Sequence, residues 1–421
     1  MWTFDETTRY FVEMALKGAS MCVPKLNINW NAEVLLWAIT KVDAFDRHFT
    51  IAETLHLTPP HMIRNLLRCR LHISDVWAMN GCLDYISNSS KFYIRMIPRR
   101  ANFAAIMGHK HVLEWFWKSD QGWEYGIAIN AALGGHIDLL RWLKEHSCVV
   151  KDEMMTLAAA VSGNMDEMQR FIEENKPFHD RCLPMAISKG HLQMAKFLYE
   201  KGAKNDGIVD IAASTGNQSV FEWAAGVQKG TPSTCAAAAE AGHLHILKMA
   251  RKLGCPWNEA TCFSAARGGH LDILQWARNN NCPWNAATCS TAARGGHLHI
   301  LKWARAHGCP WDADTCNSAA ENGHLDVIKW ARSLGCDWHS DMYCYAASGG
   351  HLHVIKWIYQ NDCPWDKDTP SLAAMYGQRQ VLEWVLEKDI RFSIWLCAFH
   401  ACCNGYDLVH DWLRRMPMNQ V

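Results

Sequence analysis

Gly269-His270-Leu271-Asp272-Ile273-Leu274-Gln275-Trp276 is the most informative segment of the sequence, because close copies of it recur along the chain. Histidine of the Gly-His pair stands at positions 243, 270, 297, 324 and 351, so each step is 27 residues. A fixed period of this length is typical of a repeat array. Weaker copies begin at His109, His136 and His191. We count twelve units from about residue 100 to residue 421, with a thirteenth candidate at Gly81-Cys82-Leu83-Asp84.

Each unit is predicted to be a helix–turn–helix. Asn258 has a side chain suited to capping the start of a helix, and Gly268-Gly269 can adopt the left-handed backbone that ends one. Apolar residues from Leu271 to Ala277 recur at the spacing of a second, amphipathic helix. Pro283 then stops the second helix, since proline cannot continue the hydrogen-bond ladder.

Two such helices cannot enclose a core of their own, so neighbouring units must stack and share one. Alanine pairs such as Ala265-Ala266 allow close helix approach. A large apolar residue follows the histidine slot by six positions, at Trp115, Trp142, Phe197, Trp223, Met249, Trp276, Trp303, Trp330, Trp357, Trp384 and Trp412. We expect this column to fill the gap between layers, where a buried Trp contributes on the order of 4–6 kcal/mol at most. The predicted fold class is an all-α solenoid.

The residues resemble the ankyrin repeat. Ala319-Ala320-Glu321-Asn322-Gly323-His324 matches the middle of the ankyrin pattern, Ala-Ala-x-x-Gly-His, and Leu325-Asp326-Val327-Ile328 matches the start of its second helix. Gly308-Cys309-Pro310-Trp311-Asp312 stands where ankyrin repeats have Gly-Ala-Asp-Val-Asn. The resemblance covers about 320 of 421 residues. Repeats with this Cys-Pro-Trp turn are similar to those of giant DNA viruses of amoebae and of some protists.

The units are shorter than the ankyrin period of about 33 residues. The missing residues lie where ankyrin proteins place their β-hairpin fingers, and only Asn258-Glu259-Ala260 separates Trp257 from Thr261. The resemblance therefore implies an ankyrin-like helical-hairpin solenoid with shortened or absent β-hairpin fingers. The repeats are expected over 81–421.

Residues 1–80 lack the Gly-His spacing. We interpret them as a helical N-terminal cap or degenerate repeats, because an open end of a stack exposes apolar surface. In the viral proteins that the array resembles, an F-box often precedes the repeats. Leu57-Thr58-Pro59-Pro60-His61-Met62-Ile63-Arg64-Asn65-Leu66-Leu67 faintly resembles the first helix of an F-box, which is the alternative interpretation.

Recurring cysteine and histidine raise the question of a metal site. Cys255, Cys262 and His270 do not have the spacing of a zinc knuckle. The Cys262 column continues as Tyr343 and Pro370, so a site in one unit is not kept in the next. We interpret the cysteines as small hydrophobic core residues, and the Gly-His histidines as hydrogen-bonding backbone in the turn. No nucleotide, metalloprotease or nucleophile motif is present, so we expect no catalytic residue, cofactor or metal.

Composition limits the partners. Lys+Arg and Asp+Glu are both 42, which disfavours nucleic acid and anionic membrane as partners. We see no secretory signal and no apolar stretch long enough to span a bilayer. The chain is therefore expected to be intracellular and cytoplasmic, in the host cytoplasm if viral. Its thiols are expected to be reduced there, which argues against disulfides.

The predicted function is a non-enzymatic protein–protein interaction scaffold. Its binding surface is expected at first-helix positions that vary between otherwise uniform units: Phe263, Ser264, Arg267, Ser290, Thr291, Arg294, Asn317, Ser318, Glu321 and Tyr345. The alternative function is a substrate-recruiting adaptor that joins a host ubiquitin ligase through residues 1–80.

Overall fold

The structure is a computed structural model that describes residues 97–118, 123, 126–203 and 205–416. Within these ranges the chain is all-α, with 24 helices and no strand, as the repeat pattern predicts. Residues 1–80, with their cap and F-box interpretations, and the candidate unit at 81–84 lie outside the described residues. Among the described helices, none combines the length and the apolar character needed to cross a membrane.

The chain divides into two compact units, Met1–Cys182 and Leu183–Val421. In the first unit, α7, α9 and α11 pack side by side, and each is followed by a partner helix that returns alongside it. The helices of the first unit are α7 (Ile97–Met107), α8 (Lys110–Lys118), α9 (Ile127–Leu133), α10 (Ile137–Glu145), α11 (Asp152–Ser162) and α12 (Met165–Glu173).

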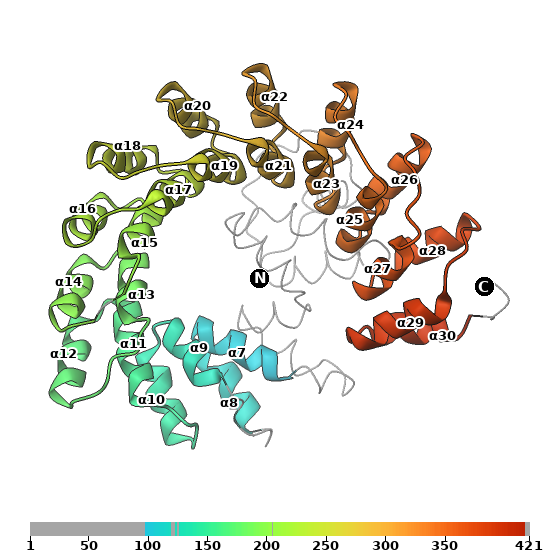
Figure 1. The fold of residues 1–421 in the computed structure, drawn as a ribbon. Coiled ribbons are helices and arrows are strands. Elements are labelled where there is room, and N and C mark those ends of the chain that lie inside the picture. The colour runs from blue at the N-terminus through green and yellow to red at the C-terminus, as the bar shows by residue number, and fades with distance from the viewer. Residues whose placement is uncertain (1–96, 119–122, 124–125, 204, 417–421) are drawn as a thin grey trace, which may run out of the picture. The chain divides into compact units, whose positions relative to one another are not determined.

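The second unit begins inside α13 and repeats the same hairpin (Figure 1). Its helices are α13 (Cys182–Ser188), α14 (Leu192–Glu200), α15 (Ile208–Thr215), α16 (Gln218–Val227), α17 (Pro232–Glu240), α18 (Leu244–Lys252), α19 (Glu259–Gly268), α20 (Leu271–Asn279), α21 (Ala286–Arg294), α22 (Leu298–Ala306), α23 (Ala313–Glu321), α24 (Leu325–Ser333), α25 (Asp341–Gly349), α26 (Leu352–Gln360), α27 (Thr369–Met375), α28 (Arg379–Glu387), α29 (Ile394–Cys403) and α30 (Asp407–Arg414).

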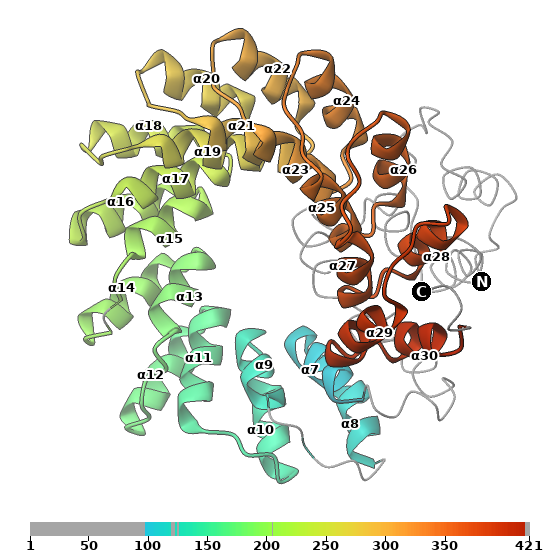
Figure 2. The same cartoon turned by 45° about the vertical axis from the view of Figure 1, so that its right-hand side comes forward.

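In the second unit the odd-numbered helices from α15 to α29 form one continuous row, each packed on the next. We call these the inner helices. The even-numbered partners, which we call the outer helices, lie along one side of that row and are splayed apart, as both views show (Figures 1 and 2). The turns that carry the Cys-Pro-Trp sequence connect each outer helix to the next inner helix.

The predicted helix signals in the α19–α20 hairpin are confirmed. The Asn258 side chain accepts a hydrogen bond from the Ala260 N–H at 3.0 Å. Gly269 ends α19 with φ +84°, and the N–H of His270 then donates to the Ala265 carbonyl at 3.0 Å. This pattern of a left-handed glycine followed by a bond back to the last turn satisfies carbonyls that the helix end would leave unpaired.

Histidine side chains of five Gly-His pairs each form a hydrogen bond to the preceding hairpin. Nε2 of His351 donates to the Glu321 carbonyl at 3.1 Å, and the same bond, 30 residues back, recurs at His136, His270, His297 and His324. Each such ring also lies against the glycine of the preceding repeat. A Cβ built on Gly323 would stand 2.6 Å from the His351 ring. The interpretation that these histidines bind backbone in the turn is confirmed.

Acid is expected to weaken the fold through His351. Burial, with a smaller contribution from nearby His353, lowers the pKa of His351 from 6.5 to about 4. Between these values the unfolded chain binds the proton and the native state does not, so stability is lost as pH falls from about 6.5 to about 4. We expect a loss of about 2 kcal/mol, allowing for partial exposure to water. Urea denaturation across this pH range measures it.

The chain supplies a matched control for that prediction. Gln378 holds the same place one repeat later, and its Nε2 donates to the Ser348 carbonyl at 3.4 Å. His351→Gln should therefore keep the hydrogen bond and remove the titration. Equal acid sensitivity of the wild type and His351→Gln would contradict the assignment.

The shared core of the second unit is aliphatic rather than aromatic. Ile300, Leu301 and Ala304 of α22 are fully buried, and so are their equivalents in the neighbouring outer helices. The Trp column differs from the prediction. Trp142 and Trp384 are buried, whereas Trp115, Trp223, Trp276, Trp303, Trp330, Trp357 and Trp412 are partly exposed. The apolar stripe is wide enough that the aliphatic pair and the alanine occupy its centre, which leaves Trp at its edge.

Candidate functional site

The predicted binding residues lie on the inner helices α19, α21, α23 and α25. Arg267, Arg294 and Tyr345 are exposed, and Phe263, Ser290, Thr291 and Glu321 are half-buried. Ser264, Asn317 and Ser318 differ from the prediction, because only 3%, 5% and 8% of their surfaces are exposed. Close packing between inner helices covers these small side chains, although they vary between repeats.

The exposed charges of this surface are paired across repeats. Arg267 lies 3.3 Å from the carboxylate of Glu240, and Arg294 lies 3.2 Å from that of Glu321. Each pair joins residues 27 positions apart in successive inner helices. Because all four side chains are partly exposed to water, at 36–47% of their surfaces, each pair contributes about 0–1 kcal/mol. The surface is therefore close to neutral, with Arg267 stacked 5.8 Å from the Phe263 ring.

Sequence reasoning missed an aromatic pair on the last inner helix. Trp395 and Phe399 of α29 stack with ring centroids 5.8 Å apart and are 75% and 51% exposed. The sequence does contain a signal for this pair, because earlier repeats have serine, at Ser290 and Ser371, in the position of Phe399. Exposed aromatic side chains are enriched where proteins bind one another.

The Cys-Pro-Trp turns form a second repeated arrangement. The Arg305 guanidinium lies 4.2 Å from the ring centroid of Trp311 and donates to the Cys309 carbonyl. Trp311 in turn meets Trp330 edge to face, at 5.7 Å. The same Arg–Trp–Trp arrangement recurs at Arg251, Arg278 and Arg332. These contacts stabilise the turns and link each turn to the next outer helix.

Arg305→Lys is expected to lower the free energy of unfolding by about 1 kcal/mol, because ammonium lacks the planar face that stacks on Trp. Lys302→Gln on the exposed side of the same helix is the control and should change little. Chemical denaturation of both variants measures the difference. Equal stability of Arg305→Lys and Lys302→Gln would show that the stack contributes nothing.

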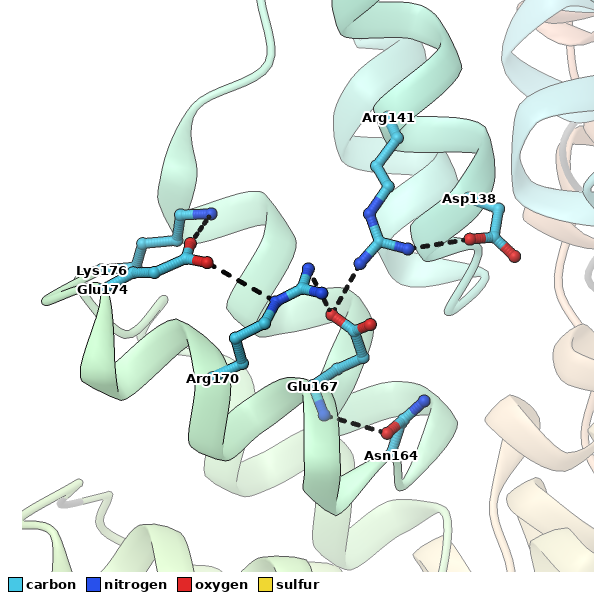
Figure 3. A network of polar contacts seen from close by, with 7 residues as sticks. All are labelled: Asp138, Arg141, Asn164, Glu167, Arg170, Glu174 and Lys176. Carbon is cyan, nitrogen blue, oxygen red and sulfur yellow. Dashed lines mark hydrogen bonds and ion pairs between the residues drawn. The ribbon is translucent and has the colours of Figure 1, made fainter.

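The first unit carries a network of charges between α10 and α12 (Figure 3). Arg141 donates to Glu167 at 2.7 Å and to Asp138 at 3.0 Å, while Arg170 contacts Glu167 at 2.9 Å. The network continues through Glu174 to Lys176. The hydrogen bond to Glu167 raises the pKa of Arg141, and the bond from Lys176 lowers the pKa of Glu174.

A polar cavity of about 400 Å³ opens beside this network. Its lining includes Lys110, His136, Arg141 and Glu167. Arg141 is already paired with two carboxylates, and His136 Nε2 donates to the Ile106 carbonyl at 3.1 Å. The polar groups of Arg141 and His136 are therefore already bonded within the protein. Nothing in the cavity concentrates charge of one sign toward a ligand.

The cysteines that the structure describes are all free thiols, and most are buried. Across the described ranges, no group of three or more His, Cys, Asp or Glu side chains is placed to hold a metal ion. Cys255, Cys262 and Cys282 are at most 4% exposed, consistent with the interpretation of cysteine as a core residue.

No protein-family model matches the chain, and no curated protein matches it. Solved structures give distant similarities to other repeat proteins. The human ASB11 ankyrin repeat domain is 17% identical, with a TM-score of 0.25, over 42% of this chain and 82% of that one. The pentatricopeptide repeat protein PPR10 in complex with an 18-nucleotide psaJ RNA element is 11% identical, with a TM-score of 0.35, over 97% and 73%. PPR10 from maize is 13% identical, with a TM-score of 0.31, over 99% and 74%. These similarities are too distant to assign the chain to a family. The described residues form a helical repeat array by their own helix order and packing.

Proposed function

We propose that the chain is a non-enzymatic interaction scaffold that binds a protein partner along the inner helices of its second unit. We further propose that the array is a short-period, fingerless ankyrin-like array of the giant-virus type, as the Gly-His and Cys-Pro-Trp patterns imply.

One observation carries the proposal. In α19, α21 and α23 the buried frame is constant, with Thr and Cys followed by two alanines, for example Thr288-Cys289 and Ala292-Ala293 in α21. The more exposed positions beside that frame change, as from Phe263 to Ser290. A constant core with a variable inner surface is how solenoids present an extended binding face.

The balance of charge favours a protein partner over a nucleic acid. Nucleic-acid binding needs an excess of Lys and Arg that can neutralise phosphates. Here Arg267 and Arg294 each have a carboxylate partner, and the formal charge of the chain is +0. Tyr345, exposed and aromatic, is of the residue type that dominates protein interfaces.

Proximity labelling in the native cell identifies the partner, and purified variants then test the face. A double charge swap, Glu240→Arg with Arg267→Glu, keeps the ion pair but reverses the field at each position. Tyr345→Ala removes an exposed anchor. We expect each variant to weaken partner capture about tenfold, equivalent to about 1.4 kcal/mol.

The control is Asp272→Lys, a charge change on outer helix α20, which should leave capture unchanged. Full capture by both inner-helix variants would reject this face. Tight binding of single-stranded RNA by the wild type, weakened by salt, would replace the protein partner with a nucleic acid.

A further inference from the structure

The last inner helix, α29, exposes a place that the earlier inner helices of the second unit bury. This place lies four residues before the histidine slot of each repeat. From α15 to α27 it is always alanine with no exposed surface, at Ala213, Ala239, Ala266, Ala293, Ala320, Ala347 and Ala374. In α29 the same place is Cys402, which is exposed. The cover that each earlier inner helix has over this place is therefore missing at α29.

The missing cover is that of a following inner helix. Thr291 of α21 donates its hydroxyl to the carbonyl of Phe263 in α19 at 3.1 Å, so the Thr291 side of α21 faces the preceding repeat. Ala293 is two residues further on and points about 200° away around the helix. Ala293 therefore faces the following repeat, and Cys402, its equivalent, lies on the side of α29 that points away from α27.

That side of α29 is apolar. Trp395, Phe399 and Cys402 are four and three residues apart, which places them on one stripe of the helix. Trp395 and Phe399 are 75% and 51% exposed, and Leu396 beside them is 37% exposed. α29 contains no Lys, Arg, Asp or Glu. We call Trp395, Leu396, Phe399 and Cys402 the end face.

The end face is complementary to a second copy of itself. Its large side chain, Trp395, lies near the start of α29, and its small one, Cys402, lies near the end. If two α29 helices pack antiparallel across a two-fold axis near Phe399, Trp395 of each copy covers Cys402 of the other and the two Phe399 rings meet. A face without charge also lets two copies approach without repulsion, whereas it offers a charged partner no opposite charge.

Charges on outer helix α30 fit the same arrangement. Arg414 holds the place of Arg332, which stacks 4.1 Å from the Trp338 ring of the following turn, but Arg414 is exposed. Asp407, at the other end of α30, is exposed as well. A two-fold axis that makes the α29 helices antiparallel also makes the α30 helices antiparallel. The Arg414 end of one copy then lies on the same side as the Asp407 end of the other, so opposite charges face each other.

We propose that the chain forms a two-fold symmetric dimer through the end face. The α29 helix of the second copy takes the place that the following inner helix has in the preceding repeats. Because a two-fold contact uses the same patch on both copies, the assembly closes at two chains. Trp395 and Phe399 are its apolar anchors, as large aromatic residues commonly are at protein interfaces.

The test measures the mass of the full-length chain in solution by sedimentation velocity over a range of concentrations. The wild type should reach twice the mass of one chain as concentration rises. Phe399→Asp places like charges on the two-fold axis, and Trp395→Glu removes the other anchor. Each should raise the dissociation constant of the dimer at least about tenfold. Both changes suit the repeat, since Asn317 and Glu259 hold the equivalent places in earlier inner helices.

Leu334→Asp is the matched control. Leu334 is 57% exposed at the end of α24, away from the end face, and Asn361 holds its place in the next repeat. This variant should dimerise like the wild type. Equal dimerisation of Phe399→Asp, Trp395→Glu and Leu334→Asp would overturn the proposal, because the dimer would then form through another surface.

A cross-link tests the antiparallel arrangement. In the variant Trp395→Cys with Cys403→Ser, copper-phenanthroline oxidation should join the introduced cysteine to Cys402 of the second copy, and mass spectrometry of the dimer band maps the bond. Two introduced cysteines joined to each other would indicate parallel helices and overturn the arrangement.

The mass itself distinguishes the other ways of covering the end face. A single-chain mass at every concentration would overturn the dimer. If Cys402 of that single chain also resists maleimide, another part of the same chain covers the face. Masses that grow beyond two chains would indicate head-to-tail stacking of arrays and would equally overturn a closed dimer.

Discussion

Replacing Gly323 by alanine is expected to lower the free energy of unfolding by about 3 kcal/mol. Gly323 has φ +77°, a conformation that costs a residue with a Cβ about 1–2 kcal/mol. The new Cβ would also stand 2.6 Å from the His351 ring. The ring must move, which breaks its bond to the Glu321 carbonyl at a cost of about 1 kcal/mol and loosens the contact between two repeats.

Gly335→Ala is the matched control for this substitution. Gly335 has the same φ of +77°, but nothing lies within 4 Å of the position its Cβ would take. Asn281 and Asp362 hold the equivalent place in other repeats with φ of 64° and 57°. Gly335→Ala should therefore cost about 1 kcal/mol. If urea denaturation gives the two variants equal stability, the histidine does not lock neighbouring repeats together.

Leu301→Ala is expected to cost about 3–4 kcal/mol, because Leu301 is fully buried at the centre of the outer-helix stripe and its loss leaves a cavity. Ile300→Val on the same helix removes one methylene from a side chain that is also fully buried and should cost about 1 kcal/mol. Denaturant unfolding followed by circular dichroism compares the two variants. If Leu301→Ala lowered the free energy of unfolding by less than Ile300→Val does, the pair Ile300 and Leu301 would not form the core.

Hairpin boundaries followed from the sequence because their signals are local. Asn258, Gly269 and Pro283 act on their own backbone, and each takes the place that its capping or stopping preference predicts. The role of the Gly-His histidine was also predictable, since a side chain between two helix ends meets unpaired carbonyls. Because the sequence pattern recurs every 27 residues, the same hairpin was predicted for each repeat.

The sequence pattern did not predict which side chains lie at the centre of the apolar face of an outer helix. Ile273, Leu274 and Trp276 all belong to the apolar face of α20, and the spacing alone does not say which lies at its centre. The structure buries the aliphatic pair and turns Trp276 toward Trp257, whose ring stacks under Arg251. No role for Arg251 was predicted from the sequence, because its position over the Trp257 ring depends on the path of the turn.

Variation between repeats was an incomplete guide to the candidate surface. Arg267 and Tyr345 are exposed as expected, whereas Asn317 and Ser318 vary and are buried. Small side chains can differ between repeats inside the packed row of inner helices, since each fits within the space that its neighbours leave.

The core shared between hairpins is tested most directly by asking how folding depends on the number of hairpins. Circular dichroism of the single hairpin 285–311 is compared with that of the four-hairpin segment 258–365. The shared core predicts an unfolded spectrum for the single hairpin and a helical, cooperatively melting spectrum for the longer segment, because one hairpin has no neighbour to cover its apolar face. A stably helical single hairpin would contradict it.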